Sequence, residues 1–388
     1  MRILTVVLVV TFHALEIKAA WGDYDTSFGF QGVAADPVTG HTPQGIVVQP
    51  DGKILVTGSR TLITGGRGFF LRRYLASGQL DTSFGTNGAA SGPEQLLSRG
   101  SDHRGHNILV LPNGKIAVGG WANGVHAVWQ FTAAGLRDLT FGVKGLKILD
   151  DYPVPESAPY RGDINLQGGK VLLSLRRGAG DDSRLVLVRL TASGTFDSTF
   201  GVGGVSTTDI DHRLRVGTVV ESNGTVTVGG NKPGTYFDIQ IDRVLANGQP
   251  DPTLISESVF GFAVLPGLLK LADGKYLMAS LNIAVGSGTL GFYKFNASGA
   301  FDSAQSSYNF VQTQDCPKIF TNQSDGKFII EFFGKLVRKD ADLSSYTEVN
   351  YCSNLNEAFT YAALLPNDKM ISVGTYNGSL ILARTLPY

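Results

Sequence analysis

The sequence predicts an all-β protein, a seven-bladed β-propeller with four antiparallel strands in each blade. Three observations support this prediction. A hairpin signal recurs seven times, and a short motif that contains Asp recurs in phase with it. The composition agrees, because 49 of the 388 residues are Gly, which favours many turns over long helices.

The hairpin signal is an apolar run, a tight turn and a second apolar run. The clearest copies read GIVVQPDGKILVTG from Gly45 and NILVLPNGKIAVGG from Asn107. Weaker copies begin at Gly162, Gly217, Gly267, Ile319 and Tyr361. Asp-Gly or Asn-Gly between such runs predicts a two-residue turn in which both residues have positive φ.

The second motif reads YDTSFG, LDTSFG, RDLTFG and FDSTFG in its first four copies and is weaker in the last three. Its leading residues are Asp25, Asp81, Asp138, Asp197, Asp251, Asp302 and Asp342, which lie 56, 57, 59, 54, 51 and 40 positions apart. An apolar run and a Gly-containing turn precede most copies. Each unit therefore holds about four short strands, as in a propeller blade. The alternative, a β-solenoid, has shorter coils without four-strand units.

The strands of the first repeat are expected at 45–49, 53–58, 69–75 and near Gly88, from the innermost to the outermost. Residues 25–35 carry the Asp motif without preceding strands, whereas residues 380–385 form a third strand with no motif after it. We therefore expect the N-terminal segment to supply the outermost strand of the last blade. Such closure removes two exposed sheet edges.

The pattern DxSFGxxG followed by PDGKIxVxG resembles the delta-60 repeat of bacterial secreted proteins, which is similar in layout to NHL-type propeller repeats. The resemblance extends over nearly all of residues 21–388. It is close in the first four units and loose in the last three. It implies a propeller fold and assigns no catalytic residue.

Residues 1–20 are expected to be a secretory signal peptide. A basic start at Met1-Arg2, an apolar run from Ile3 to Leu15 and the small pair Ala19-Ala20 are typical of such leaders. The alternatives are a buried strand or a membrane anchor, but a spanning helix needs about 20 apolar residues. We therefore expect residues 21–388 to form a single propeller domain that is secreted, either extracellular or periplasmic.

The two cysteines, Cys316 and Cys352, fit an oxidising compartment and are expected to form a disulfide. Closing a loop of this length contributes about 3–4 kcal/mol in the chain-entropy model. The alternative is two unrelated buried thiols. The sequence has no CxxC pair and no Cys/His spacing of a structural zinc site.

The chain offers little that indicates catalysis or a charged partner. Thirty-three basic residues balance thirty-three acidic ones, so no net charge favours nucleic acid or an anionic membrane. P-loop, GxSxG, HExxH and dinucleotide-binding motifs are absent, and no cofactor is expected. The repeated Asp residues are expected to cap backbone N–H groups in turns. His103 with His106, and the segment from Asp209 to His212, have incomplete ligand sets, so no metal is expected.

Binding residues are expected on the face that carries the long loops and the connections between blades, because a rigid scaffold holds such loops in place. The candidate ligand-binding residues are His103, Arg104, His106, Trp121, Arg161, Asp163, Arg176 and Lys318. Arg161, Lys318 and His106 belong to a ring of residues just before the inner strands. This ring would make the channel mouth mildly cationic and suited to small anions, unless the side chains turn outward toward loop acids.

The sequence therefore predicts a secreted, monomeric binding or interaction module that holds a glycan, peptide or protein. The alternative is a propeller enzyme of the lactonase, lyase or glycosidase type, with its site at the channel mouth. Carboxylates or His residues that converge there would favour the enzyme, since the fold alone decides neither.

Overall fold

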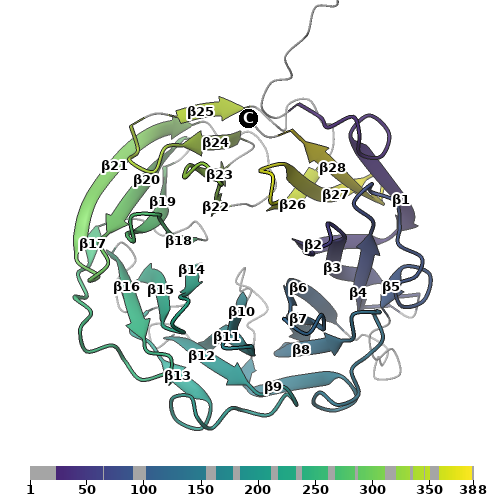
Figure 1. The fold of residues 1–388 in the computed structure, drawn as a ribbon, viewed down its shortest axis with the longest axis horizontal. Coiled ribbons are helices and arrows are strands. Elements are labelled where there is room, and N and C mark those ends of the chain that lie inside the picture. Colours follow the sequence, from purple (N-terminus) through teal and green to yellow (C-terminus); the bar gives the residue numbers. More distant parts are fainter. Residues whose placement is uncertain are drawn as a thin grey trace, which may run out of the picture.

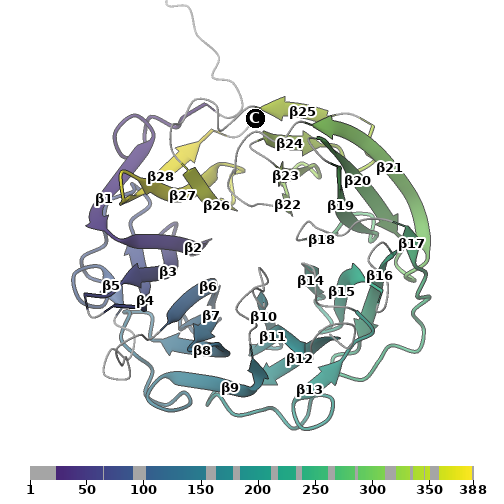
Figure 2. The same cartoon turned by 180° about the vertical axis from the view of Figure 1, so that it is seen from behind.

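The seven-bladed propeller is confirmed. The computed structural model describes residues 23–63, 65–90, 102–153, 163–177, 184–210, 217–232, 238–260, 267–284, 287–310, 320–332, 335–344, 346–349 and 358–386. Within these residues, 28 strands form seven four-stranded antiparallel sheets that stand in a ring around a central axis (Figures 1 and 2). None of the described segments is a helix long and apolar enough to cross a membrane.

The strands of each blade follow one another outward from the central axis. From the innermost to the outermost strand, blades 1 and 2 contain β2 (His41–Val48), β3 (Ile54–Thr61), β4 (Arg67–Tyr74) and β5 (Ala89–Ala90), then β6 (His103–Val110), β7 (Ile116–Ala122), β8 (Val125–Phe131) and β9 (Leu146–Pro153). Blades 3 and 4 contain β10 (Asp163–Gln167), β11 (Lys170–Arg177), β12 (Arg184–Leu190) and β13 (Val205–Thr207), then β14 (Gly217–Val220), β15 (Val226–Asn231), β16 (Asp238–Val244) and β17 (Val259–Phe260).

The second half of the ring follows the same order. Blades 5 and 6 contain β18 (Leu268–Lys270), β19 (Tyr276–Ala284), β20 (Ser287–Phe295) and β21 (Phe301–Phe310), then β22 (Phe320–Asn322), β23 (Phe328–Phe332), β24 (Lys335–Lys339) and β25 (Tyr346–Val349). Blade 7 contains β26 (Ala358–Leu364), β27 (Met370–Tyr376), β28 (Ser379–Thr385) and β1 (Val33–Thr39).

The N-terminal strand closes the ring, as expected. Strand β1 pairs antiparallel with β28, with Ala34 opposite Leu382. The closing strand is also fixed to blade 1, because buried Asp36 accepts hydrogen bonds from the Tyr74 hydroxyl and the Arg72 guanidinium, each at 2.8 Å. The closing strand is therefore held to blade 7 by backbone pairing and to blade 1 by the Asp36 side chain.

The hydrophobic core is divided among the interfaces between blades. Side chains alternate along each strand, so each blade contributes one face to the preceding blade and the other to the next. Phe70 of β4 packs with residues of blade 7, whereas Leu71 packs with Trp129 of blade 2. Stability therefore depends on contacts between neighbouring units, as in other repeat architectures.

Six of the seven repeated Asp residues cap turns, as expected, whereas Asp302 lies within β21 and accepts from Lys275 instead. In blade 3, Asp197 Oδ1 accepts hydrogen bonds from the backbone N–H and the hydroxyl of Thr199. Its Oδ2 accepts hydrogen bonds from Lys170 Nζ at 2.6 Å and Arg189 Nε at 2.7 Å. Asp25 in blade 7 makes the same set of contacts with a serine, a lysine and an arginine.

The motif also joins neighbouring blades, as at the junction of blades 3 and 4. Arg189 of blade 3 donates a hydrogen bond to the Ala246 carbonyl of blade 4 at 2.9 Å and lies over the buried ring of Phe200. The Gly201 N–H donates to the Asn247 carbonyl at 2.7 Å. Gly248, with φ +83°, leaves the space for this contact, because a Cβ there would lie 2.5 Å from the Gly201 nitrogen. The motif is thus an interlock between blades.

The hairpin turns differ from the prediction in their type. In the first hairpin, Gly52 has a φ of +81°, and Asp51 is absent from the described residues with positive φ. The Gly52 N–H donates to the Gln49 carbonyl, and the Asp51 carboxylate accepts from the Lys53 N–H. This is a type I turn followed by a left-handed glycine. The predicted two-residue turn occurs between β10 and β11, where both Gly168 and Gly169 have positive φ.

Candidate functional site

The inner strands carry a feature that the sequence did not predict. The pairing of β2 with β3 skips Gln44, and the equivalent ladders in blades 2 and 7 skip His106 and Thr360. Each of these residues is therefore the extra residue of a β-bulge, which re-aims a side chain locally. Gln44 and His106 are buried, His106 being only 2% exposed.

The residue after each bulge reaches the channel. A cavity of about 290 Å³ lies among the inner strands β2, β6, β10 and β26, and Gly45, Asn107 and Tyr361 line it directly after the bulges. Asp163, the first residue of β10, and Asn165 complete the polar part of the lining. We call this cavity the axial pocket.

Hydrogen-bonding groups dominate the axial pocket. Asn107 Nδ2 donates to Asp163 Oδ1 at 3.5 Å, which orients the carboxylate. Asn165 Nδ2 is buried and has no hydrogen-bond partner among the described residues. Ile46, Ile108, Ile164 and Ala362 complete the lining with apolar residues. The described lining therefore offers one carboxylate, two amides and one phenol.

Three of the predicted binding residues meet near this pocket, on blade 2. Arg104 pairs with Asp102 and lies over the Trp121 ring at 5.3 Å. The His106 imidazole contacts the same ring edge-on, with the centroids 4.8 Å apart. Because Arg104 and Trp121 are opposite each other in the β6–β7 ladder, this cluster lies on one face of the blade.

The other candidates are placed differently. His103 is buried and lies 6.2 Å from the Trp129 ring, so the two histidines contact different tryptophans. Burial lowers the pKa of His103, although the Asp102 charge raises it. Arg176 lies on β11, where its Nε is buried without a hydrogen-bond partner among the described residues. Within the described part of the chain, no three His, Cys, Asp or Glu side chains are grouped so as to hold a metal ion.

Several expectations lie outside the described residues. These are the cationic candidates Arg161 and Lys318, the Cys316–Cys352 disulfide and the signal peptide at 1–20. The anion-binding mouth and the disulfide stay predictions.

Asn107, Asn165 and Tyr361 were not among the predicted binding residues. In blades 2 and 7 the residue one position earlier, His106 or Thr360, was predicted to form the mouth, because counting from the hairpin lysine assumes regular strands. No residue type marks a β-bulge, so the shift by one position has no sequence signature. Gly45, directly after Gln44, has no room for a side chain, since a Cβ there would overlap the His106 carbonyl.

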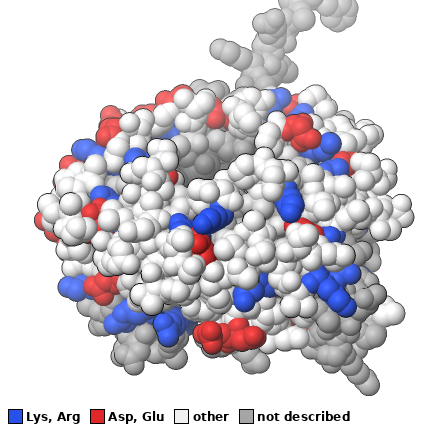
Figure 3. All heavy atoms as spheres, turned by 60° about the horizontal axis from the view of Figure 1, so that its bottom comes forward, with Lys and Arg blue, Asp and Glu red and all other residues white. Residues whose placement is uncertain are grey.

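The charge on the surface is mixed. In the space-filling view, Lys and Arg are interspersed with Asp and Glu over the visible face, and neither sign covers it (Figure 3). This distribution fits the formal net charge of zero. A ligand would therefore be selected by an individual pocket, because no broad electrostatic field is available to attract it.

A family model described as a domain of unknown function, DUF5122 beta-propeller, matches residues 49–84 and 178–200. The chain is similar to a β-propeller family. The matched segments hold the first hairpin turn and two copies of the Asp motif. No curated protein matches the chain.

Solved structures share the fold at low sequence identity. A chain of the mitotic checkpoint complex matches with a TM-score of 0.55 and 11% identity, covering 100% of this chain and 99% of that chain. Drosophila semaphorin 1a, extracellular domains 1-2, matches with a TM-score of 0.51, 9% identity and coverages of 91% and 87%. An ulvan lyase bound to a GlcA(1-4)Rha3S saccharide gives 0.50, 13% identity and coverages of 90% and 94%. These similarities show the propeller fold alone.

Proposed function

We propose that the protein is a secreted binding module that holds a small hydrogen-bonding part of a glycan, peptide or protein ligand in the axial pocket. One observation carries the proposal. Asn165 presents a buried amide without a partner among the described residues, on the same strand as the Asp163 carboxylate. A buried donor without a partner costs about 1–3 kcal/mol, and a ligand acceptor would remove that cost.

The size of the pocket limits what can enter. A volume of about 290 Å³ is at the lower end of ligand sites, which span about 300–1,000 Å³. One sugar residue or one polar side chain fits this volume better than a long polymer segment does. Amide, carboxylate and phenol groups together donate to and accept from hydroxyls, which are the polar groups of sugars.

An enzyme would need a different set of groups in the same pocket. Glycosidase-type chemistry uses two carboxyl groups about 5–9.5 Å apart, so a second acid would have to face Asp163. An enzyme would release altered product from a bound glycan. A binding module would return it unchanged, which mass spectrometry of the recovered ligand distinguishes.

The test is a binding screen of glycans and peptides with the purified protein, followed by variants. Asn165→Ala and Asp163→Asn should weaken binding of the best ligand about tenfold or more, since each removes a hydrogen bond worth about 1.4 kcal/mol. Asn113→Ala is the matched control, because Asn113 is an exposed hairpin residue on blade 2, outside the axial pocket. Unchanged affinity in both pocket variants would contradict the proposal.

A further inference from the structure

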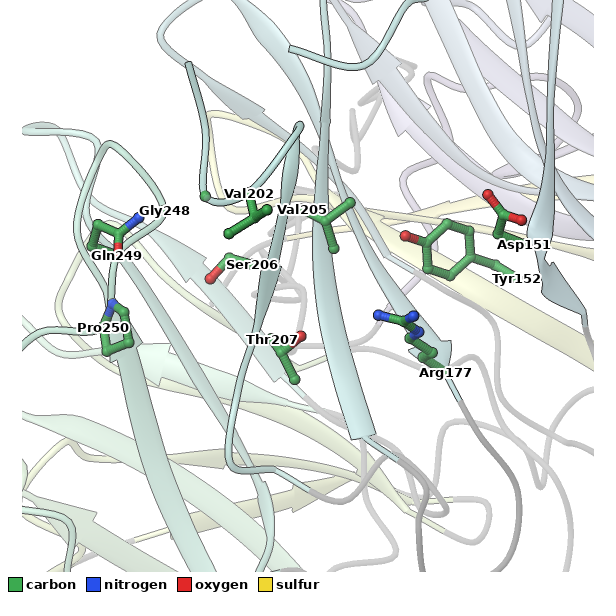
Figure 4. A pocket seen from close by; sticks show the side chains of 11 residues that line it. Asp151, Tyr152, Arg177, Val202, Val205, Ser206, Thr207, Gly248, Gln249 and Pro250 are labelled. Atoms are coloured by element: carbon green, nitrogen blue, oxygen red, sulfur yellow. The ribbon is translucent and has the colours of Figure 1, made fainter. Parts of the chain in front are cut away.

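A larger cavity lies on the outside of the ring, away from the axial pocket. It has a volume of about 690 Å³ and is lined by residues from three blades. The outermost strands β9 of blade 2 and β13 of blade 3 form its walls, together with the blade 4 turn at Gly248–Pro250 (Figures 1 and 4). We call this cavity the rim groove.

Two residues that are largely buried carry hydroxyl groups at the rim groove. Tyr152 is 4% exposed and Ser206 is 5% exposed, and both line the cavity. Neither hydroxyl forms a hydrogen bond to another described residue, and neither oxygen is fully buried, so both are open to the groove. In Figure 4 the Tyr152 hydroxyl points toward β13, into the space between the two strands. Both hydroxyls are therefore available to hydrogen-bond a ligand or water in the groove.

A cationic side chain lies beside these hydroxyls. Arg177, at the end of β11, is exposed and forms no ion pair within the described part of the chain. Figure 4 shows its guanidinium directed toward β13, below the Tyr152 ring. Burial raises the pKa of Tyr152 and Asp151 adds to this, although the Arg177 charge opposes it. Tyr152 is therefore a neutral donor at physiological pH, and Arg177 supplies the positive charge.

Part of the groove is apolar. Val202 is 84% exposed, and Val205 and Pro250 line the cavity with it. The groove thus combines this carbon surface with polar groups on both β9 and β13, including the Asp151 carboxylate beside Tyr152. A pyranose ring has the same mixed character, because its hydroxyls lie around the edge and its C–H groups form an apolar face.

An added peptide strand fits the groove less well than a sugar. Peptides that extend a sheet need free backbone N–H and C=O groups along its edge. Val205 on β13 uses both groups on Val202, with N···O distances of 2.8 and 3.2 Å. Farther along, the Asp209 N–H and carbonyl are taken by Asp242 and Gln240 of blade 4. The edge of β13 is therefore closed on both sides of Thr207.

We propose that the rim groove binds a saccharide residue that carries an anionic group, either a carboxylate or a sulfate. The guanidinium of Arg177 binds the anionic group, because its planar fork matches both kinds of oxyanion. Tyr152 and Ser206 hydrogen-bond the ring hydroxyls, and Val202 contacts the apolar face of the ring. This site is independent of the axial pocket, with which it shares no lining residue.

The test is isothermal titration of the full chain with three tetrasaccharides, one with glucuronate, one with sulfate and one neutral. Inorganic sulfate is a fourth titrant. Wild type should bind one or both anionic saccharides at least tenfold more tightly than the neutral one and than sulfate alone. The anionic saccharide that binds more tightly shows whether the site prefers a carboxylate or a sulfate. Equal affinity for the neutral saccharide, or no binding of either anionic one, would overturn the proposal.

Variants locate the binding. Arg177→Gln and Tyr152→Phe should each reduce affinity for the anionic saccharide about tenfold. Arg67→Gln is the matched control, an exposed arginine at the start of β4, and should bind as wild type. Val202→Glu tests the site even if Tyr152→Phe fails to fold. Its position is exposed and tolerates a charge, and the new carboxylate repels an anion. Unchanged affinity in Arg177→Gln and Val202→Glu would place any binding elsewhere and refute the proposal.

The proposals for the axial pocket and for the rim groove can be tested independently. Asp163→Asn should leave binding of the anionic saccharide unchanged, whereas Arg177→Gln should leave binding at the axial pocket unchanged. If Asp163→Asn abolishes binding of the anionic saccharide, the saccharide occupies the axial pocket, and the assignment to the rim groove is wrong.

Discussion

The junction between blades 3 and 4 depends on the carboxylate of Asp197. It receives Lys170 at 2.6 Å and Arg189 at 2.7 Å, while Arg189 also donates to Ala246 in the next blade. Asp197→Asn keeps the shape and one acceptor oxygen for the cap with Thr199 but removes the negative charge. The Arg189 side chain, only 10% exposed, is then left without its counter-ion.

The magnitude follows from the burial of each partner. Removing one member of a buried ion pair costs about 3–5 kcal/mol, mostly because the remaining charge stays buried. The Lys170 side chain is 38% exposed and can return to water, so its share is about 0–1 kcal/mol. Arg189 keeps its hydrogen bond to the Ala246 carbonyl, which places the expected loss near the lower limit, at about 3 kcal/mol.

The effect should also depend on pH. Burial alone would raise the pKa of Asp197, but hydrogen bonds from Lys170 and Thr199 and the hydrogen bond from Arg189 hold it well below the usual range. A depressed folded-state pKa stabilises the fold above the unfolded value of about 4 and loses this effect as pH falls. The difference between wild type and Asp197→Asn should therefore be constant from pH 7 to 5 and shrink below pH 4.

Urea unfolding followed by tryptophan fluorescence measures the difference in the free energy of unfolding. It is calculated from the shift of the midpoint, provided that the slope m is the same for both proteins. Asp342→Asn is the matched control, because Asp342 is the equivalent residue of the motif in blade 6, where its exposed carboxylate caps Ser344. Its midpoint should stay near that of wild type. Equal midpoints for wild type and Asp197→Asn at pH 7, or a difference that grows in acid, would refute the reasoning.

Three further perturbations test the ring. Gly248→Ala should destabilise the fold more than Gly274→Ala, since both have φ +83° but only the first places a Cβ against the next blade; equal unfolding midpoints would contradict the interlock. Deleting residues 21–40 should expose the β28 edge and produce oligomers in analytical ultracentrifugation, whereas a stable monomer would argue against closure by β1. Tyr74→Phe should cost about 2 kcal/mol through the lost hydrogen bond to Asp36. Because burial and the Asp36 charge raise the pKa of Tyr74, the stability that the hydroxyl provides is lost above about pH 10. The cost of Tyr74→Phe should shrink there, and a cost that persists at pH 11 would count against this account.

The fold could be predicted from the sequence because its signals are local and repeated. Each hairpin and each Asp motif occupies a few adjacent residues. Because seven copies occur at similar spacing, the clear copies identify the weak ones. The turn type was also readable, since Pro50 before Asp51-Gly52 is typical of a type I turn. The Asp-Gly pair by itself favours the two-residue turn, and the prediction that rests on it is wrong for that hairpin.

The sites could be predicted only in part, because they join residues that are distant in the sequence. Asp163 is a candidate from the sequence and does line the axial pocket. The bulge at His106 accompanies a contact of that side chain with Trp121 of the same blade, and Asn107 lines the channel instead. The rim groove combines Tyr152 with Ser206, from two different blades. A local sequence pattern cannot predict this site, because these two residues are far apart in the sequence.

The interlock between blades has a consequence for the position of the chain ends. The Leu386 N–H donates to the Asp23 carbonyl at 2.9 Å, so the two ends of the described chain already touch. The junction between blade 7 and blade 1 uses the same backbone contact as the junctions from blade 1 through blade 5, since Gly29 donates to Ser77 as Gly201 donates to Asn247. A circularly permuted gene that joined these ends and opened the chain before Asp81 would encode the same closed ring, with blade 1 completed by its new N-terminus. Whole repeats are thus the natural units in which such a gene can be cut, rotated or lengthened.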